Sequence, residues 1–466
     1  MPAHCGGASG GGVRRLNIFF GGVDDIGVEG CIVEVNMDKS DVKHLIDVID
    51  AVPPLPLVVS KVVEVADNPN SSAQDLANII CEDTGLTARV LKLINSSFYG
   101  FSRRISTVTE SVILLGFEVI TNIVIWISVA RHIGTKESQV LDRQRFWQHS
   151  LGAAASAKIL SQLIGYPNPE EAFIAGLLHD IGKIFFDEYV SDEYAAVVSR
   201  MDEGERNELR AERQVLGTDH AAVGQMLLKK WRLPQVYQMT TRYHHAPLRY
   251  EARLSTSIGR LVGAVHLADV FAKMHGYACD AHAYIPAVDP RVWKLLQLSE
   301  EDGSRTFLMF AEELKRAKEF FGIACSDELG DIKLAGGGEV KQVLLVSRHE
   351  PPVSTVRILL TAAGFDVACG ILTRDGIVLP PGAEPHVVVL DLDEIGSDLG
   401  SIITFITALQ GATPVKALIL QNAPAAPNEA RLYEKQGVFF LRKPFRAVEL
   451  LGELRDVLRQ KAESTC

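Results

Sequence analysis

Apolar positions recur with helical spacing over more than half of the chain. From Val42 onward, apolar residues return every three or four positions, which is the period of a helix with one buried face. Ser72 followed by Asp75 resembles a capping box, and this pair predicts a helix that begins directly after Ser72. We expect helices to follow one another without strands to about Gly276, with a further short helical stretch over residues 291–321.

The longest apolar run, Val119 to Ala130, is predicted to be a buried helix. Polar residues interrupt the run at Thr121, Asn122 and Ser128. The run is also shorter than the roughly 20 apolar residues that a membrane span requires. We therefore expect no membrane span here.

The pattern changes towards the end of the chain. Short apolar runs typical of buried strands alternate there with helical stretches, at residues 343–346, 387–390, 417–420 and 438–441. A glycine-rich stretch over residues 330–338 is typical of a flexible connection. The expected parts are a disordered or poorly defined segment (1–40), an all-helical domain (41–290), a helical extension with a Gly-rich linker (291–340) and a doubly wound α/β domain (341–466).

Composition and charge favour an ordinary globular protein over one that binds nucleic acid broadly. The chain has 466 residues, of which 47% are hydrophobic, and its formal net charge of -11 argues against broad binding to nucleic acid. The seven cysteines are scattered and form no CxxC pair, as expected for reduced thiols. The first residues do not have the order of a secretory signal, so we expect a cytoplasmic protein.

Histidines and aspartates within apolar helical stretches are the candidate chemistry. The adjacent His179 and Asp180 can bind the same ion, and imidazole and carboxylate ligands together suit Fe, Mn, Zn or Ni. One or two divalent ions are expected. The candidate ligands are His149, His179, Asp180, His220, His244, His245 and Asp269. Taken singly, each histidine is equally explained as a hydrogen-bonded core or surface residue, and one of the neighbours His244 and His245 would suffice as a ligand.

Lys183 is a candidate catalytic residue together with Asp180. It lies four residues after His179 and so on the same helical face, where an ammonium group can neutralise a phosphate or protonate a leaving group.

The order of His149, His179-Asp180 and Asp269 resembles the H, HD and D pattern of the HD superfamily of metal-dependent phosphohydrolases. The resemblance to its HDOD subgroup extends upstream and covers roughly residues 52–276, through Leu55-Pro56, Asp83-Thr84-Gly85-Leu86-Thr87, Asn95-Ser96-Ser97-Phe98-Tyr99-Gly100 and Ser111-Val112-Ile113-Leu114-Leu115-Gly116. This resemblance implies a regulatory output domain of bacterial signalling. It implies no particular substrate, because members of the subgroup share no common reaction and often lack metal ligands.

Three further histidines look like the second-metal ligands of the HD-GYP cyclic-dinucleotide phosphodiesterases: His220, His244 and His245. The resemblance implies that Asp180 bridges two ions, with His149, His179 and Asp269 on the other ion. The chain departs from that family, because residues 231–234 and 243–247 stand where its GYP segment would be.

The end of the chain resembles a response-regulator receiver. Asp391 ends one predicted strand and Lys443 follows another, as the phospho-acceptor and its lysine do in receivers. Ser347-Arg348-His349 stands where receivers have the acidic pair that binds magnesium. We expect a degenerate receiver-like domain used for docking, with slow or no phosphorylation. The alternative is an ordinary strand-end pair.

Two functions remain open on these grounds. The first is a regulatory scaffold that binds signalling proteins. The second is a phosphohydrolase acting on a nucleotide or another phosphoester, which requires an open coordination position beside Lys183. The sequence does not identify the substrate, the upstream signal, the oligomeric state or the role of residues 16–38.

Overall fold

The structure is a computed structural model of the chain. It describes residues 47–96, 101–132, 140–249, 256–279, 284–286, 288–321, 342–347, 354–373, 376–378, 385–391, 415–421, 434, 437–443 and 445–459. The expected disorder of residues 1–40 and the expected flexibility of residues 330–338 fall outside this described part.

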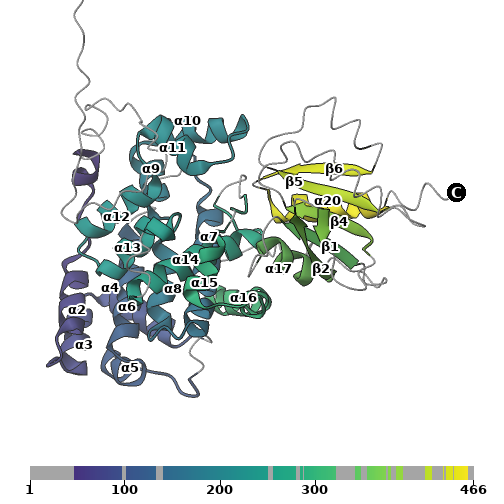
Figure 1. Cartoon of the computed structure of the whole chain (residues 1–466). Coiled ribbons are helices and arrows are strands. Elements are labelled where there is room, and N and C mark those ends of the chain that lie inside the picture. The colour runs from purple at the N-terminus through teal and green to yellow at the C-terminus, as the bar shows by residue number, and fades with distance from the viewer. Residues whose placement is uncertain are drawn as a thin grey trace, which may run out of the picture. The chain divides into compact units, whose positions relative to one another are not determined.

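The first part of the described chain is helical, as the apolar spacing predicts (Figure 1). Its helices are α2 (Leu57–Asp67), α3 (Ala73–Cys81), α4 (Thr84–Ile94), α5 (Val108–Leu115), α6 (Phe117–His132), α7 (Arg143–Leu163), α8 (Pro169–Leu178), α9 (Ile181–Tyr189), α10 (Ser191–Asp202), α11 (Glu208–Leu216), α12 (His220–Lys230), α13 (Gln235–Tyr243), α14 (Ser257–Met274), α15 (Pro290–Leu296) and α16 (Glu300–Phe321).

Side-chain caps determine where several of these helices begin. The capping box of α3 is confirmed, since the Ser72 side chain accepts the N–H of Asp75 and the Asp75 carboxylate accepts the N–H of Ser72 at 2.8 Å. Asp219 caps α12 by accepting the N–H of Ala222 at 2.8 Å. The first residue of α12 is therefore His220, a candidate ligand.

Close helix packing at the centre brings the candidate ligands together. Helix α7 packs along both α8 and α14. The approach to α8 is close, because a Cβ on Gly176 would lie 2.8 Å from the Ala153 carbonyl oxygen. Helix α9 meets the start of α12 more closely still, since a Cβ on Gly182 would lie 2.0 Å from the His220 carbonyl oxygen. Glycine at both positions allows backbone contact where side chains would hold the helices apart.

The long apolar run is a buried helix, as expected. It forms α6, in which Asn122 is buried and accepts a 2.6 Å hydrogen bond from the hydroxyl of Tyr237. None of the described helices combines the length and the apolar character needed to cross a bilayer.

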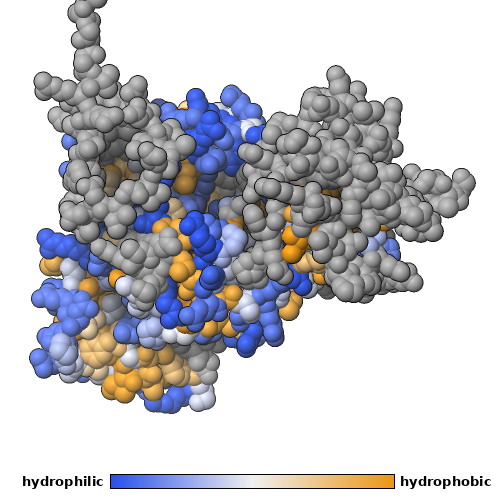
Figure 2. Space-filling model, viewed as in Figure 1, coloured by the Kyte–Doolittle hydropathy of each residue, from blue (hydrophilic) through white to orange (hydrophobic). Residues whose placement is uncertain are grey.

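Apolar side chains gather on the surface at α5 (Figure 2), where Ile113 is 70% and Leu114 46% exposed.

The later part contains a mixed α/β unit. Its strands are β1 (Gln342–Ser347), β2 (Asp366–Thr373), β3 (Gly376–Val378), β4 (Val387–Asp391), β5 (Lys416–Gln421) and β6 (Val438–Arg442), and its described helices are α17 (Thr355–Ala362) and α20 (Ala447–Arg459). The sheet order is β3-β2-β1-β4-β5-β6.

The strand order is compatible with a flavodoxin-like sheet. Strands β2, β1, β4, β5 and β6 pair in parallel, and β3 adds an antiparallel edge. The four predicted strands correspond to β1, β4, β5 and β6. Strands β2 and β3 were not predicted, because Asp366 and Gly370 interrupt the apolar run of β2 and β3 has only three residues.

Candidate metal centre

Seven candidate ligands converge from different helices. They are His149 in α7, His179 directly after α8, Asp180 directly before α9, His220 at the start of α12, His244 and His245 directly after α13, and Asp269 in α14. All are buried except His245, which is partly exposed. The structure therefore brings together every candidate ligand that the sequence suggested.

The first group consists of His149, His179 and Asp269. The Nε2 atoms of His149 and His179 lie 3.2 Å apart. Oδ1 of Asp269 lies 3.2 Å from Nε2 of His149 and 3.7 Å from Nε2 of His179. Two imidazole nitrogens and one carboxylate oxygen thus face a common point.

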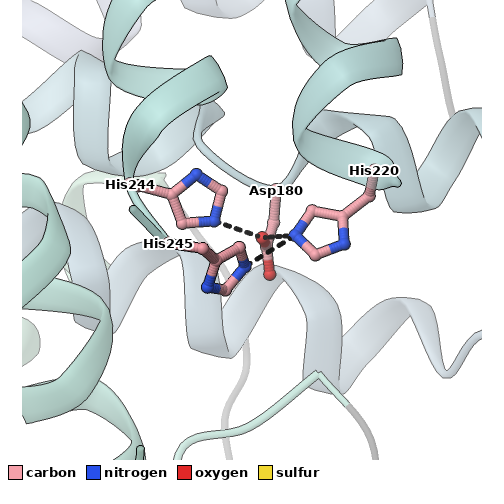
Figure 3. A group of neighbouring side chains, drawn as sticks. All are labelled: Asp180, His220, His244 and His245. Atoms are coloured by element: carbon pink, nitrogen blue, oxygen red, sulfur yellow. Dashed lines mark hydrogen bonds and ion pairs between the residues drawn. The ribbon is translucent and has the colours of Figure 1, made fainter. Parts of the chain in front are cut away.

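The second group consists of Asp180, His220, His244 and His245 (Figure 3). Oδ1 of Asp180 lies 3.1 Å from Nε2 of His220 and 3.4 Å from Nε2 of His244. The Nε2 atoms of His220 and His245 lie 2.8 Å apart. Asp180 also faces the first group, because its Oδ2 lies 3.5 Å from Nε2 of His149. Its carboxylate therefore lies between the two groups.

Hydrogen bonds from Nδ1 orient three of the candidate histidines so that Nε2 faces the other candidate ligands. Nδ1 of His149 donates to the carbonyl of Tyr277 at 3.0 Å. His179 and His244 donate in the same way to the carbonyl oxygens three residues earlier, at 2.7 and 2.8 Å. A carbonyl oxygen only accepts, so these Nδ1 atoms carry a ring proton and Nε2 is the nitrogen that remains to bind a metal. This is the tautomer that binds metal through Nε2.

The donor set fits a divalent cation. Oδ1 of Asp180, Oδ1 of Asp269 and Nε2 of His244 are buried and have no hydrogen-bond partner. Buried acceptors without a donor are costly, and they lie in both ligand groups, with Oδ1 of Asp180 3.4 Å from Nε2 of His244. A cation in each group satisfies these atoms, and mixed nitrogen and oxygen ligands suit Zn, Fe, Mn or Ni.

Two lysines balance the negative charge of the carboxylates. Nζ of Lys183 lies 3.0 Å from Oδ2 of Asp180 and 2.8 Å from Oε1 of Glu208. Lys273 lies 2.8 Å from Oδ2 of Asp269. Burial alone would raise the pKa of Asp180, but the neighbouring His179 and the ammonium of Lys183 hold it well below its usual range. The role of Lys183 as an acid stays a prediction.

The imidazole of His244 remains neutral at ordinary pH. Burial lowers the pKa of its imidazole to about 4, with the neighbouring His179 adding to the effect and Asp180 opposing it. His266, a residue without an expected role at the site, supports His244 from behind by donating from Nδ1 to its carbonyl oxygen at 2.6 Å.

Sequence reasoning missed two buried residues at the centre. Glu212 in α11 accepts the Nδ1–H of His220 at 2.8 Å, and Cys279 lies with its Sγ 3.3 Å from Oδ2 of Asp180. Neither belongs to the H, HD and D pattern. A glutamate eight residues before a candidate histidine was the available signal for Glu212.

The receiver-like pair also meets in space. Lys443 and Asp391 form an ion pair between the ends of β6 and β4. Ser347 lies beside Asp391 in the register of β1 and β4. Arg348 and His349 lie outside the described residues. The expectation of a degenerate receiver stays a prediction.

Comparisons with known proteins agree with the helical fold. Residues 52–247 match the family model of the HDOD domain. An uncharacterized protein of Treponema pallidum (strain Nichols) is 27% identical over 224 residues, which cover 45% of this chain and 41% of that protein. The chain thus aligns with less than half of that relative's length.

A solved structure gives the same assignment. The HDOD domain protein with unknown function from Geobacter sulfurreducens is 25% identical, with a TM-score of 0.52, and the match covers 60% of this chain and 97% of that one. The family match and this structural match together show that residues 52–247 form an HDOD domain.

Proposed function

We propose that this protein is a bacterial signalling regulator whose HDOD domain and adjoining α14 bind one or two divalent ions. The ligands come from helices far apart in the sequence, and α7 and α14 alone are separated by more than 90 residues. An ion that binds them together ties these helices into one arrangement. Metal binding thereby sets the shape that a partner protein recognises.

The convergence of the histidine Nε2 atoms on the carboxylates of Asp180 and Asp269 is the observation that carries this proposal. One ion is held by His149, His179 and Asp269, and the other by His220, His244 and His245. Asp180 lies between them and contributes to both. A divalent ion at this position supplies Lewis acidity as well as structural cross-linking.

Burial favours a structural and regulatory role over turnover. His149, His179, His220 and His244 are each 0% exposed. Lys183 is 2% exposed, and its ammonium is already bound by two carboxylates. A catalytic acid has to reach the leaving group of a substrate, whereas a lysine that balances charge acts from this position.

Elemental analysis of freshly purified protein tests metal binding. We expect one or two ions of Fe, Mn, Zn or Ni per chain in the wild type, and none in the double variant His179→Ala/Asp180→Ala. A wild-type protein that contains no metal and takes up none on dialysis against these ions would contradict the proposal. The same samples give the thermal shift on metal loading, which we expect to be positive.

The second ligand group favours a second candidate function, a metal-dependent phosphohydrolase. A single structural ion does not need His220, His244 and His245, whereas two ions about 3.5–4 Å apart stabilise the attacking and leaving oxygens of a phosphoester. The metal-loaded protein is tested with bis-p-nitrophenyl phosphate and with nucleotides. Turnover that disappears in Lys183→Ala supports the enzyme. Metal-dependent stabilisation without turnover supports the regulator.

The α/β unit fits the regulatory role as a docking domain for signalling proteins. The pair of Asp391 and Lys443 has the arrangement of a receiver's acceptor and lysine. Ser347 stands at the end of β1, where receivers begin their magnesium-binding acidic pair. Phosphorylation without that ion is slow, so we infer that this domain acts by binding partners.

A further inference from the structure

The segment that follows α14 folds back against the metal centre. Gly276 has a φ of +80°, a left-handed conformation that turns the chain at the end of the helix. The N–H of Tyr277 donates to the carbonyl of Ala272 at 3.0 Å, and the carbonyl of Tyr277 accepts Nδ1–H from His149. These two hydrogen bonds therefore hold the short segment against the candidate ligand His149.

Cys279 reaches the ligand atoms from this segment. Its side chain is buried, at 4% exposure, and its thiol donates to Oδ2 of Asp180 at 3.3 Å. The ligand atoms of His149, Asp180 and Cys279 all lie within 4.8 Å of one another. Metal bonds of about 2.3 Å to sulfur and about 2.0–2.1 Å to nitrogen place two ligands of one ion roughly 3–4.5 Å apart. The sulfur is therefore at coordinating distance.

We propose that Cys279 is a thiolate ligand of the ion that His149 and Asp180 bind. The inference rests on the proposed metal binding and adds the chemical character of one site. As the ion binds, the thiol gives its proton to solvent and an Sγ–metal bond replaces the Sγ–H···Asp180 hydrogen bond. A soft sulfur ligand shifts the preference of this ion towards zinc or iron and away from magnesium or calcium.

The direction of the sulfur distinguishes this role from simple packing. A buried free cysteine commonly acts as a small apolar residue. Here the thiol donates to Oδ2 of Asp180, whose carboxylate lies between the two groups of converging ligands. A cysteine that only filled space in the core would not need to contact the carboxylate of Asp180.

Cobalt substitution reports directly on sulfur coordination. Thiolate bound to Co²⁺ gives an intense near-ultraviolet charge-transfer band, which nitrogen and oxygen ligands do not give. We expect this band in the full-length wild type loaded with Co²⁺ and its loss in Cys279→Ser, with affinity for Co²⁺ weaker by about tenfold or more. Cys81→Ser is the matched control, because Cys81 is an exposed free cysteine and its loss should leave the band intact.

The possible outcomes distinguish a failure of the thiolate proposal from a failure of the proposed metal binding. A wild type that binds no Co²⁺ overturns both the metal centre and the thiolate ligand. A wild type that binds Co²⁺ without the band, or a Cys279→Ser variant that keeps it, overturns only the thiolate ligand. X-ray absorption spectroscopy of the zinc-loaded wild type is a test that does not depend on a variant folding. We expect it to show a sulfur atom about 2.3 Å from the zinc.

Discussion

Glu212 holds His220 at two points. Its carboxylate accepts the main-chain N–H of His220 at 2.9 Å and the ring Nδ1–H at 2.8 Å, and both side chains are fully buried. Burial raises the pKa of Glu212, although the charge of His220 opposes this shift. The double contact fixes the ring so that its Nε2 faces Asp180 and His245. A carboxylate behind a ligating histidine also makes the imidazole a stronger ligand.

Replacing Glu212 by glutamine should therefore weaken metal binding while preserving the shape of the side chain. We expect the dissociation constant for Zn²⁺ to rise by about 10–100-fold, as is usual when a hydrogen-bond partner behind a ligand is lost. Competition with a chromophoric chelator measures this change. Glu203→Gln, at an exposed position near α11, is the control and should bind Zn²⁺ like the wild type. An unchanged affinity in Glu212→Gln would show that His220 is not a ligand.

The charge balance at Asp180 predicts that Lys183→Met destabilises the metal-free protein. Removing this ammonium leaves the buried carboxylate of Asp180 and the partly buried carboxylate of Glu208 without their shared cation. Breaking a buried ion pair costs about 3–5 kcal/mol, so we expect the free energy of unfolding to fall by this order. Bound Zn²⁺ should restore part of the loss, because the ion supplies positive charge beside Asp180.

Urea unfolding with and without Zn²⁺ measures both effects of Lys183→Met. Lys229→Met is the control, because Lys229 is exposed in α12. Equal stabilities for Lys183→Met and the wild type without metal would mean that the ammonium does not compensate the two carboxylates.

The sequence predicted the helices and the candidate ligands because each has a local pattern of residues. Apolar spacing identified the helical part, and the adjacent His179 and Asp180 indicated the ligand site. Glu212 and Cys279 belong to no recognisable sequence pattern. They reach the candidate metal centre through the packing of α11 and through the turn after α14. Contacts of this kind depend on tertiary structure and have no fixed spacing along the chain.

The contact between α9 and α12 predicts a large effect for Gly182→Ala. The added methyl group would lie 2.0 Å from the carbonyl oxygen of His220, which is backbone and cannot rotate away. Overpacking commonly costs about 1–3 kcal/mol, and relief by separating the helices would also move His220 away from Asp180. We therefore expect lower stability together with weaker metal binding.

Gly452→Ala is the matched control for this substitution. Gly452 lies within α20 and has nothing within 4 Å of an added Cβ. Alanine there should stabilise the helix by about 0.5–1 kcal/mol, since glycine is a poor residue in a helix interior. Thermal unfolding and Zn²⁺ titration of both variants test the comparison. Gly182→Ala with wild-type stability and affinity would show that α9 and α12 pack less closely than described.

A buried histidine outside the ligand set predicts how stability depends on pH. His275 is stacked between Phe307 and Phe310, with ring centroids 3.8 and 3.9 Å away. Burial lowers the pKa of its imidazole to about 3. The unfolded chain has the ordinary histidine pKa of about 6.5, so between these values the unfolded state binds a proton that the folded state does not. The free energy of unfolding therefore falls as the pH decreases from about 6.5 towards 3.

His275→Phe should remove this contribution while keeping a flat ring between the two phenylalanines. Over the fall from pH 7 to pH 5, we expect the wild type to lose about 2 kcal/mol more stability than the variant, at roughly 1.4 kcal/mol per pH unit below the ordinary pKa. Urea unfolding at both pH values, with chelator present, measures this difference. All other titratable groups are common to the two proteins and cancel in the comparison. Parallel losses of stability in the two proteins would mean that His275 is protonated within the folded state, and that its ring is not confined between Phe307 and Phe310.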